Sequence, residues 1–240
     1  MITPNPVIQF RQASKQYHGR YALEPLTLDI APGEFLSVVG SSGGGKTTLL
    51  KLINGLLLPS SGQVLVLGQD TAQVDLIALR RQIGYVIQGA ALFPHLTVAD
   101  NIGYVPSLSG KKLSQERLEQ LMKLVDLSPE LLSRYPISLS GGQQQRVGIA
   151  RALANRPPIM LMDEPFGAVD EITRVILQDS IQQLHRQLQT TIVFVTHNIR
   201  EALYLSDRVL ILNHGQVQQL DKPDAIRTNP ATQYVKQLLR

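Results

Sequence analysis

A glycine-rich stretch between an apolar segment and a helix-forming segment constrains the fold of this chain more than any other feature. Residues 34–39, Glu-Phe-Leu-Ser-Val-Val, have the pattern of a short buried strand. They run directly into Gly-Ser-Ser-Gly-Gly-Gly-Lys-Thr at residues 40–47. A helix is expected from Thr47 to about Asn54, where Gly55 stops it. Strands that alternate with helices along the chain indicate an α/β fold with a parallel sheet.

The rest of the chain continues this alternation, with one interruption. Further strands are expected at residues 7–11, 26–30, 63–67, 83–87, 159–162, 192–195 and 209–212. A long amphipathic helix is expected before the strand at 192–195. Its apolar stripe consists of Leu177, Ile181, Leu184 and Leu188.

Residues 88–156 differ in character from the rest and are expected to form an inserted helical subdomain. Helical spacing runs from Ser114 to Val125, and a second helix begins near residues 139–143 and ends before Pro157 and Pro158. Residues 1–87 and 157–240 would then form the α/β core, so that residues 1–240 make one domain.

Composition excludes several classes of protein. The chain has 240 residues and no cysteine, which excludes disulfides and thiolate metal sites. No apolar run is long enough for a membrane helix, and the N-terminus lacks the pattern of a signal peptide, so a cytoplasmic location is expected. The net charge is +4 with scattered Lys and Arg, which favours a solvated surface over a nucleic-acid interface.

Residues 40–47 match the phosphate-loop pattern GxxxxGK[ST]. The glycines allow backbone N–H groups to surround phosphates, Lys46 would reach the β and γ oxygens, and the Thr47 hydroxyl would bind Mg²⁺. The positive N-terminus of the following helix favours the same anion. The predicted nucleotide contacts here are Gly40, Ser41, Ser42, Gly43, Gly44, Gly45, Lys46, Thr47 and Thr48.

Two neighbouring carboxylates follow the apolar segment at residues 159–162. Asp163 stands at the end of that expected strand, where a carboxylate can hold Mg²⁺ directly or through water. Adjacent strand residues point to opposite sides, so Glu164 is free for another role, which we expect to be that of general base for an attacking water.

Further motifs carry a family resemblance. Leu-Ser-Gly-Gly-Gln occupies residues 139–143, between the phosphate loop and the acidic pair, and His197 follows the strand expected at 192–195. In this order the motifs resemble those of the ATP-binding-cassette (ABC) ATPases, over nearly the whole chain. The resemblance implies a phosphate-loop NTPase fold with a parallel-sheet core, an antiparallel β subdomain and an inserted helical subdomain.

The resemblance also implies roles for single residues. Gln88 would contact Mg²⁺ and the lytic water, and His197 would bond the γ-phosphate of ATP. Tyr17 resembles the aromatic residue that stacks on adenine, with Tyr21 as the competing candidate. The expected catalytic residues are Glu164, His197, Gln88 and Lys46, and the expected Mg²⁺ ligands are Thr47, Gln88 and Asp163.

In this family LSGGQ acts across a pair of subunits. Ser140, Gly141, Gly142 and Gln143 of one copy would close on ATP held by the other, and Asp170 would communicate across the interface. A second copy of the chain is therefore the first expected partner.

Comparison with other ATPases of this type favours a transport subunit. DNA-repair ATPases that share LSGGQ separate the two halves by long coiled coils, and no heptads occur here. Residues 80–88, 92–98, 142–147 and 164–174 resemble the ATPase subunits of quaternary-amine importers (glycine betaine, carnitine, choline), which act with membrane permease subunits and a solute-binding protein. Many such subunits continue into regulatory CBS domains, and this sequence stops at Arg240. Another solute, such as an amino acid or a lipid, is the alternative, and action on DNA is a weaker one.

The segment from Gln88 to Val105 is expected to meet the membrane partner, at the cytoplasmic face of the membrane. It places the apolar residues Leu92, Phe93 and Leu96 in a loop-like setting. We expect them to help form a groove for a cytoplasmic helix of the permease. Ordinary packing of the helical subdomain is the alternative.

Overall fold

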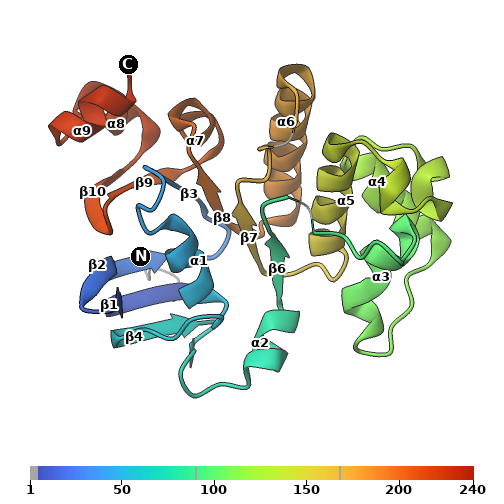
Figure 1. Ribbon diagram of the computed structural model, residues 1–240, viewed down its shortest axis with the longest axis horizontal. Coiled ribbons are helices and arrows are strands. Elements are labelled where there is room, and N and C mark those ends of the chain that lie inside the picture. Colours follow the sequence, from blue (N-terminus) through green and yellow to red (C-terminus); the bar gives the residue numbers. More distant parts are fainter. Residues whose placement is uncertain (1–4, 90, 168) are drawn as a thin grey trace. The chain divides into compact units, whose positions relative to one another are not determined.

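The computed structural model describes residues 5–89, 91–167 and 169–240. The chain divides into two compact units. Figure 1 labels their helices and strands. The first unit comprises Met1–Arg80 and Gln189–Arg240, and the second comprises Arg81–Leu188. The helical subdomain expected over residues 88–156 stays a prediction. In the described part of the chain, no helix is both long enough and apolar enough to cross a membrane.

The first unit contains an antiparallel sheet with strand order β2-β1-β4-β5. Its strands are β1 (Ile8–Tyr17), β2 (Arg20–Ile30), β4 (Ser61–Val66) and β5 (Gln69–Asp70). Ile8 and Phe10 are fully buried while Gln9 between them is partly exposed, which is the alternation of a sheet with one covered face. The antiparallel β region implied by the family resemblance is present, and its strands are longer than the apolar pattern predicted.

A second sheet of this unit contains the strand that enters the glycine loop. Within the unit its strands lie in the order β10-β9-β3-β8, with β3 parallel to both β8 and β9 and with β10 antiparallel to β9. The bounds are β3 (Phe35–Gly40), β8 (Thr191–Thr196), β9 (Arg208–Asn213) and β10 (Gln216–Asp221). Every residue of β3 and β8 is buried, as expected for continuous apolar strands of a parallel sheet.

Helices complete the core of the first unit. They are α1 (Lys46–Ile53), α7 (Ile199–Leu205), α8 (Pro223–Thr228) and α9 (Gln233–Leu238). The helical residues Ala202, Ile226 and Val235 are packed with Val39 and Val209 of the sheet in one buried cluster. The C-terminal helices therefore cover apolar strand residues that would otherwise be exposed (Figure 1).

The second unit combines a parallel strand pair with helices. Strands β6 (Ile83–Val86) and β7 (Ile159–Asp163) pair in parallel, and helix α5 packs against both β6 and helix α3. The helices are α3 (Val98–Ser107), α4 (Gln115–Leu124), α5 (Gly141–Leu153) and α6 (Glu171–Leu188), with short 3₁₀ helices at Pro129–Ser133 and Pro136–Ser138. Helix α2 (Leu76–Arg81) ends at the first residue of this unit.

The predicted apolar stripe of helix α6 is buried except at its last residue. Leu177, Ile181 and Leu184 are buried on α6, whereas Leu188 is 45% exposed. Leu188 is the last residue of α6. The apolar stripe thus continues by one turn beyond the part of the helix that is covered.

Candidate functional site

The glycine loop between β3 and α1 is tightly folded. Gly45 has φ 98°, a left-handed conformation that side chains disfavour, and a Cβ atom there would lie 2.5 Å from the carbonyl oxygen of Ala22. The N–H of Gly44 donates to the carbonyl oxygen of Ser41 at 3.0 Å. Only glycine fits the turn at residue 45, which explains in physical terms why the motif has glycine at this position.

Lys46 lies inside this loop. Its side chain is 7% exposed, and Nζ donates to the carbonyl oxygens of Gly40 at 2.9 Å and Ser41 at 2.8 Å. The buried ammonium therefore lies against the glycine backbone at the N-terminus of α1. Together, the ammonium, the tight turn and the helix N-terminus fit a phosphate group. Thr47 is exposed and Thr48 is half-buried in the first turn of the same helix.

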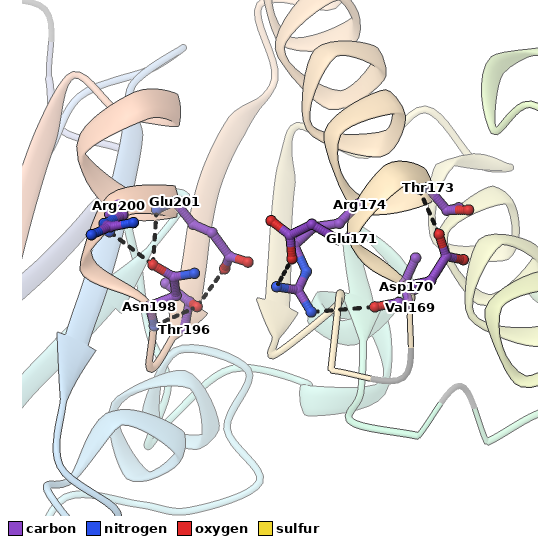
Figure 2. Close-up of polar contacts among 9 residues, drawn as sticks. All are labelled: Val169, Asp170, Glu171, Thr173, Arg174, Thr196, Asn198, Arg200 and Glu201. Carbon is purple, nitrogen blue, oxygen red and sulfur yellow. Dashed lines mark hydrogen bonds and ion pairs between the residues drawn. The ribbon is translucent and has the colours of Figure 1, made fainter.

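His197 is held between the end of β8 and the start of α7. Its neighbour Thr196 donates from Oγ1 to Glu201 Oε2 at 2.6 Å and accepts from the N–H of Asn198 at 3.0 Å. Asn198 Oδ1 in turn accepts from the N–H groups of Arg200 and Glu201, which caps α7 (Figure 2). These bonds fix the backbone on both sides of the exposed His197.

The two tyrosines considered for adenine stacking are equally accessible. Tyr17 is 46% exposed at the end of β1 and Tyr21 is 45% exposed in β2. Lys15 Nζ lies 5.4 Å from the centre of the Tyr17 ring, within cation–π range. Exposure does not choose between the two rings.

In the second unit, Gln88 and the acidic pair lie together. Asp163 ends β7 and is 7% exposed, and Gln88 Nε2 donates to Glu164 Oε2 at 3.3 Å. Burial, and secondarily the charge of Asp163, raise the pKa of Tyr85 to about 12. The structure thus brings the amide of Gln88 to the carboxylate of Glu164, although the two residues are far apart in the sequence.

The expected reason for the direction of Glu164 is wrong. Strand alternation was expected to turn its side chain away from that of Asp163. However, β7 ends at Asp163, and Glu164 has φ 47°, a left-handed conformation uncommon for this residue type. A backbone turn, and not the pleat of a strand, sets the direction of Glu164.

Two of the groups expected to bind Mg²⁺ lie at the ends of regular elements. The carboxylate of Asp163 is at the end of strand β7, and the hydroxyl of Thr47 is in the first turn of helix α1. Among the described residues, no group of three or more His, Cys, Asp or Glu side chains could hold a metal ion. Mg²⁺ commonly takes one or two carboxylates and completes its shell with phosphate oxygens and water. The residues present therefore fit Mg²⁺ bound with a nucleotide better than an all-protein metal site.

The LSGGQ segment begins a helix. Ser140 is the N-cap of α5, where its Oγ accepts from the N–H of Gln143 at 3.2 Å and its own N–H donates to Gln143 Oε1 at 2.9 Å. This is a capping box. Our sequence interpretation missed it, although a serine followed three residues later by glutamine is its signature. Gly141 is exposed, and a Cβ atom added at Gly142 would meet no other atom within 4 Å, so the start of α5 is open.

Asp170 begins the next helix in the same way. Its Oδ1 accepts from the N–H of Thr173 at 3.0 Å, and this bond lowers the pKa of the Asp170 carboxyl (Figure 2). Arg174 Nη1 lies 3.0 Å from Glu171 Oε2, and Nη2 donates to the carbonyl oxygen of Val169 at 3.2 Å. Asp170 is therefore oriented at the N-terminus of α6. Ala168, in the same motif, lies outside the described residues.

Comparison with known proteins identifies the family. Residues 23–167 match the family model for the ABC transporter. This chain belongs to the ABC transporter family. It is 50% identical over 236 residues to the glycine betaine/carnitine/choline transport ATP-binding protein OpuCA of Bacillus subtilis, a match that covers 97% of this chain and 62% of that protein. It is 44% identical over 233 residues to the glycine betaine uptake system ATP-binding protein YehX of Escherichia coli, covering 96% and 76% respectively.

A solved structure confirms the fold class of this ABC transporter chain. The ATP-binding cassette MJ0796, determined as a dimer in a post-hydrolysis state bound to ADP and Pi, matches with a TM-score of 0.83 and 35% identity. The match covers 90% of this chain and 98% of that chain. The present chain spans less than two thirds of the length of OpuCA.

Proposed function

We propose that this chain is the ATP-hydrolysing subunit of a membrane importer for quaternary-amine solutes such as glycine betaine or choline. One observation carries the proposal. The same chain contains a glycine loop around the buried Lys46 and a helix whose N-terminus at Ser140 is open. The first motif suits phosphate binding, and the second offers a further set of free N–H groups to an anion. The similarity to OpuCA and YehX supports the transport role and the solute class.

The residues of the two units take complementary roles in this proposal. The N–H groups of residues 40–45 and the ammonium of Lys46 hold the ATP phosphates, with Tyr17 at the adenine. Thr47, Asp163 and Gln88 hold Mg²⁺, which supplies charge neutralisation at the phosphates when bound.

Glu164 accepts a proton from the attacking water in the proposed reaction. Its carboxylate accepts a hydrogen bond from Gln88 Nε2 at 3.3 Å, which would help to orient it for this role. His197 donates to the γ-phosphate. The fixed backbone around His197 supports such a role, because a preformed donor needs no reorganisation during the reaction.

A second copy of the chain completes each site in the proposed mechanism. Ser140, Gly141, Gly142 and Gln143 of one copy contact ATP held by the other, and Asp170 lies at the interface between them. The dimeric state of MJ0796 supports this arrangement. Closure would exclude water from two ATP molecules, and hydrolysis would release the pair.

The permease contact is proposed at a pocket of about 600 Å³ in the second unit. Leu96, Tyr104 and Leu118 line it, and Lys111 and Lys112 lie at the same pocket. The apolar residues of this lining suit the apolar face of a cytoplasmic helix. Phe93 was expected to help form the groove; its ring centre lies 4.5 Å from that of Tyr104, and the guanidinium of Arg151 lies over the Phe93 ring. These contacts favour a packing role for Phe93, so Leu96 and Tyr104 are better probes of the groove.

Blocking this pocket tests the permease contact. Gly103 lines the pocket, and a Cβ atom added there would meet no other atom within 4 Å, so the flexible side chain introduced by Gly103→Met can start into the groove without a clash at its Cβ atom. In the assembled transporter, solute uptake should fall while the melting temperature and basal ATP hydrolysis stay near wild type. Gly103→Ala is the matched control with a small side chain. Uptake unchanged by Gly103→Met would contradict the assignment.

Reconstitution of the chain with its permease in vesicles tests the function as a whole. The proposal expects peripheral association with the cytoplasmic face of the membrane, through the permease, and uptake of glycine betaine or choline that requires ATP. Lys46→Ala should abolish uptake and phosphate release together, because the ammonium at the phosphates is lost. Uptake of an amino acid or lipid instead of both amines would contradict the solute class and leave the ATPase role intact.

A further inference from the structure

A second group of positive charges lies in the second unit, away from the motifs described above. Lys111, Arg117 and Arg156 line a pocket of about 450 Å³. They come from three segments, which are the loop before α4, the first turn of α4 and the turn after α5. No residue of the phosphate loop, the acidic pair or LSGGQ lines this pocket.

Among the described residues that line this pocket, positive charges outnumber negative ones. Glu116 is the one carboxylate among its lining residues, and its Oε1 accepts from Gln120 Nε2 at 3.4 Å. In the described part of the chain, none of the three cations forms an ion pair, whereas Arg146 of α5 pairs with Asp126 at 3.3 Å. Two guanidinium groups and an ammonium therefore face one pocket with a net positive charge.

The two arginines repel each other at this position. Partial burial, and secondarily the charge of Arg156, lower the pKa of Arg117. Like charges placed together are unfavourable unless an anion offsets them. Two local features define the backbone at Arg156. Arg156 has a left-handed backbone with φ 48° directly before Pro157, and the side chain of Asn155 donates to the carbonyl oxygen of Arg81 at 3.0 Å.

We propose that this pocket is a binding site for a phosphate group carried by a small molecule or by a lipid headgroup. The proposal does not depend on the ATP site. Three cations and the carboxylate of Glu116 give the lining a net charge of about +2. A phosphate monoester, with a charge of about −1.5 to −2 at neutral pH, matches this net charge better than a ligand with one carboxylate group does. The planar guanidinium of arginine matches phosphate oxygens in a bidentate manner. The volume lies within the range of small-molecule sites, and Pro106, Leu113 and Ala154 give the pocket an apolar side for the remainder of the ligand.

Nuclear magnetic resonance can locate such binding directly. The Lys46→Ala chain, labelled with ¹⁵N, lacks the principal phosphate-binding cation of the glycine loop and is titrated with inorganic phosphate. Saturable shifts are expected for the backbone amides of residues 114–117 and 154–156. Hydrogen bonds from charged groups are among the stronger ones in binding, so Arg117→Ser or Arg156→Ser should raise the dissociation constant for phosphate by about tenfold.

Lys112→Ser is the matched control. It removes the same charge next to Lys111, but Lys112 lines only the other pocket. Phosphate binding should stay within about twofold of the parent. Absence of saturable shifts in the pocket, or equal weakening by Lys112→Ser and Arg156→Ser, would overturn the proposal. Shifts caused by a glutamate-rich peptide but not by phosphate would also overturn it and favour an acidic protein segment.

Cosedimentation with vesicles separates the two sources of phosphate. Vesicles of phosphatidylcholine with phosphatidic acid, whose headgroup is a phosphate monoester, are compared with vesicles of phosphatidylcholine alone. Binding to the anionic vesicles that Arg117→Ser and Arg156→Ser abolish would support a lipid headgroup. Phosphate binding in solution without vesicle binding would support a soluble phosphate compound. The melting temperature of each variant must match that of the parent, so that a loss of binding reflects the pocket and not the fold.

Discussion

At the scale of single residues, the acidic end of β7 shows how one position affects another. Asp163 is almost completely buried, and its charge contributes to the raised pKa of Tyr85 on the paired strand. Glu164, the next residue, leaves the strand with a left-handed backbone and accepts a hydrogen bond from Gln88. Two adjacent carboxylates therefore have different surroundings, which is a common basis for two different chemical roles.

The titration of Tyr85 tests these surroundings. Its pKa is raised from 10.0 to about 12, so the folded state holds the phenolic proton more tightly than the unfolded state. The resulting stability is fully present below pH 10 and is lost as the pH rises to about 12. Absorbance of tyrosinate should show one late step that Tyr85→Phe removes. Asp163→Asn should lower this pKa only in part, since burial is the larger cause, and a complete return to the ordinary value would contradict that order.

The same scale shows what the sequence could and could not reveal. The phosphate-loop glycines, Lys46, Asp163 and Ser140 could be proposed as site residues because their motifs combine fixed spacing with a strand or helix boundary. The contact of Gln88 with Glu164 could not be derived from spacing, because it depends on the pairing of β6 with β7. The capping box at Ser140 could have been predicted, since it needs only the local sequence.

At the scale of elements, apolar periodicity located helix α6 but did not show which of its apolar side chains are buried. Leu184 is 3% exposed and Leu188 is 45% exposed, although both lie on the predicted stripe. Helix α3 was missed because Gly103 and Pro106, which disfavour helix, lie within it. Strand β10 was missed because three of its six residues are glutamine. Tertiary packing overrides local preference in each case.

The two leucines of α6 offer a matched comparison. Leu184→Ala should lower the free energy of unfolding by about 2–5 kcal/mol, because it leaves a cavity in a packed core. Leu188→Ala should cost less than about 1 kcal/mol, since much of that side chain is already in solvent. Denaturant unfolding of both variants measures the difference. Equal losses would show that Leu188 is covered in solution.

At the scale of the whole molecule, the motifs belong to two units of the chain. Lys46 and His197 lie in the first unit, and Gln88, Glu164 and Ser140 lie in the second. The fold class was predictable because strands and helices alternate around a recognisable loop. The division of the chain after Arg80 and before Gln189 could not be predicted, because it depends on contacts between segments far apart in the sequence.

Mixed pairs test whether each site is shared between two copies. Lys46→Ala disables the phosphate loop, and Ser140→Arg places a large cation at the start of α5. In a mixed pair, one site carries both defects and the other carries neither. If copies exchange freely and sites act independently, an equal mixture should show roughly a quarter of wild-type hydrolysis while each parent shows almost none. Activity that stays at the parental level would contradict independent shared sites.

ATP turnover by Glu164→Gln is the most direct measurement of the central claim, that this chain hydrolyses ATP with Glu164 as the base. The substitution keeps the shape of the side chain and its contact with Gln88 but removes the basic oxygen. Phosphate release should fall by at least about 100-fold, while ATP binding stays near wild type and size-exclusion chromatography shows an ATP-dependent dimer. The exposed Glu130→Gln is the control and should hydrolyse normally. Near-normal phosphate release by Glu164→Gln would contradict the account.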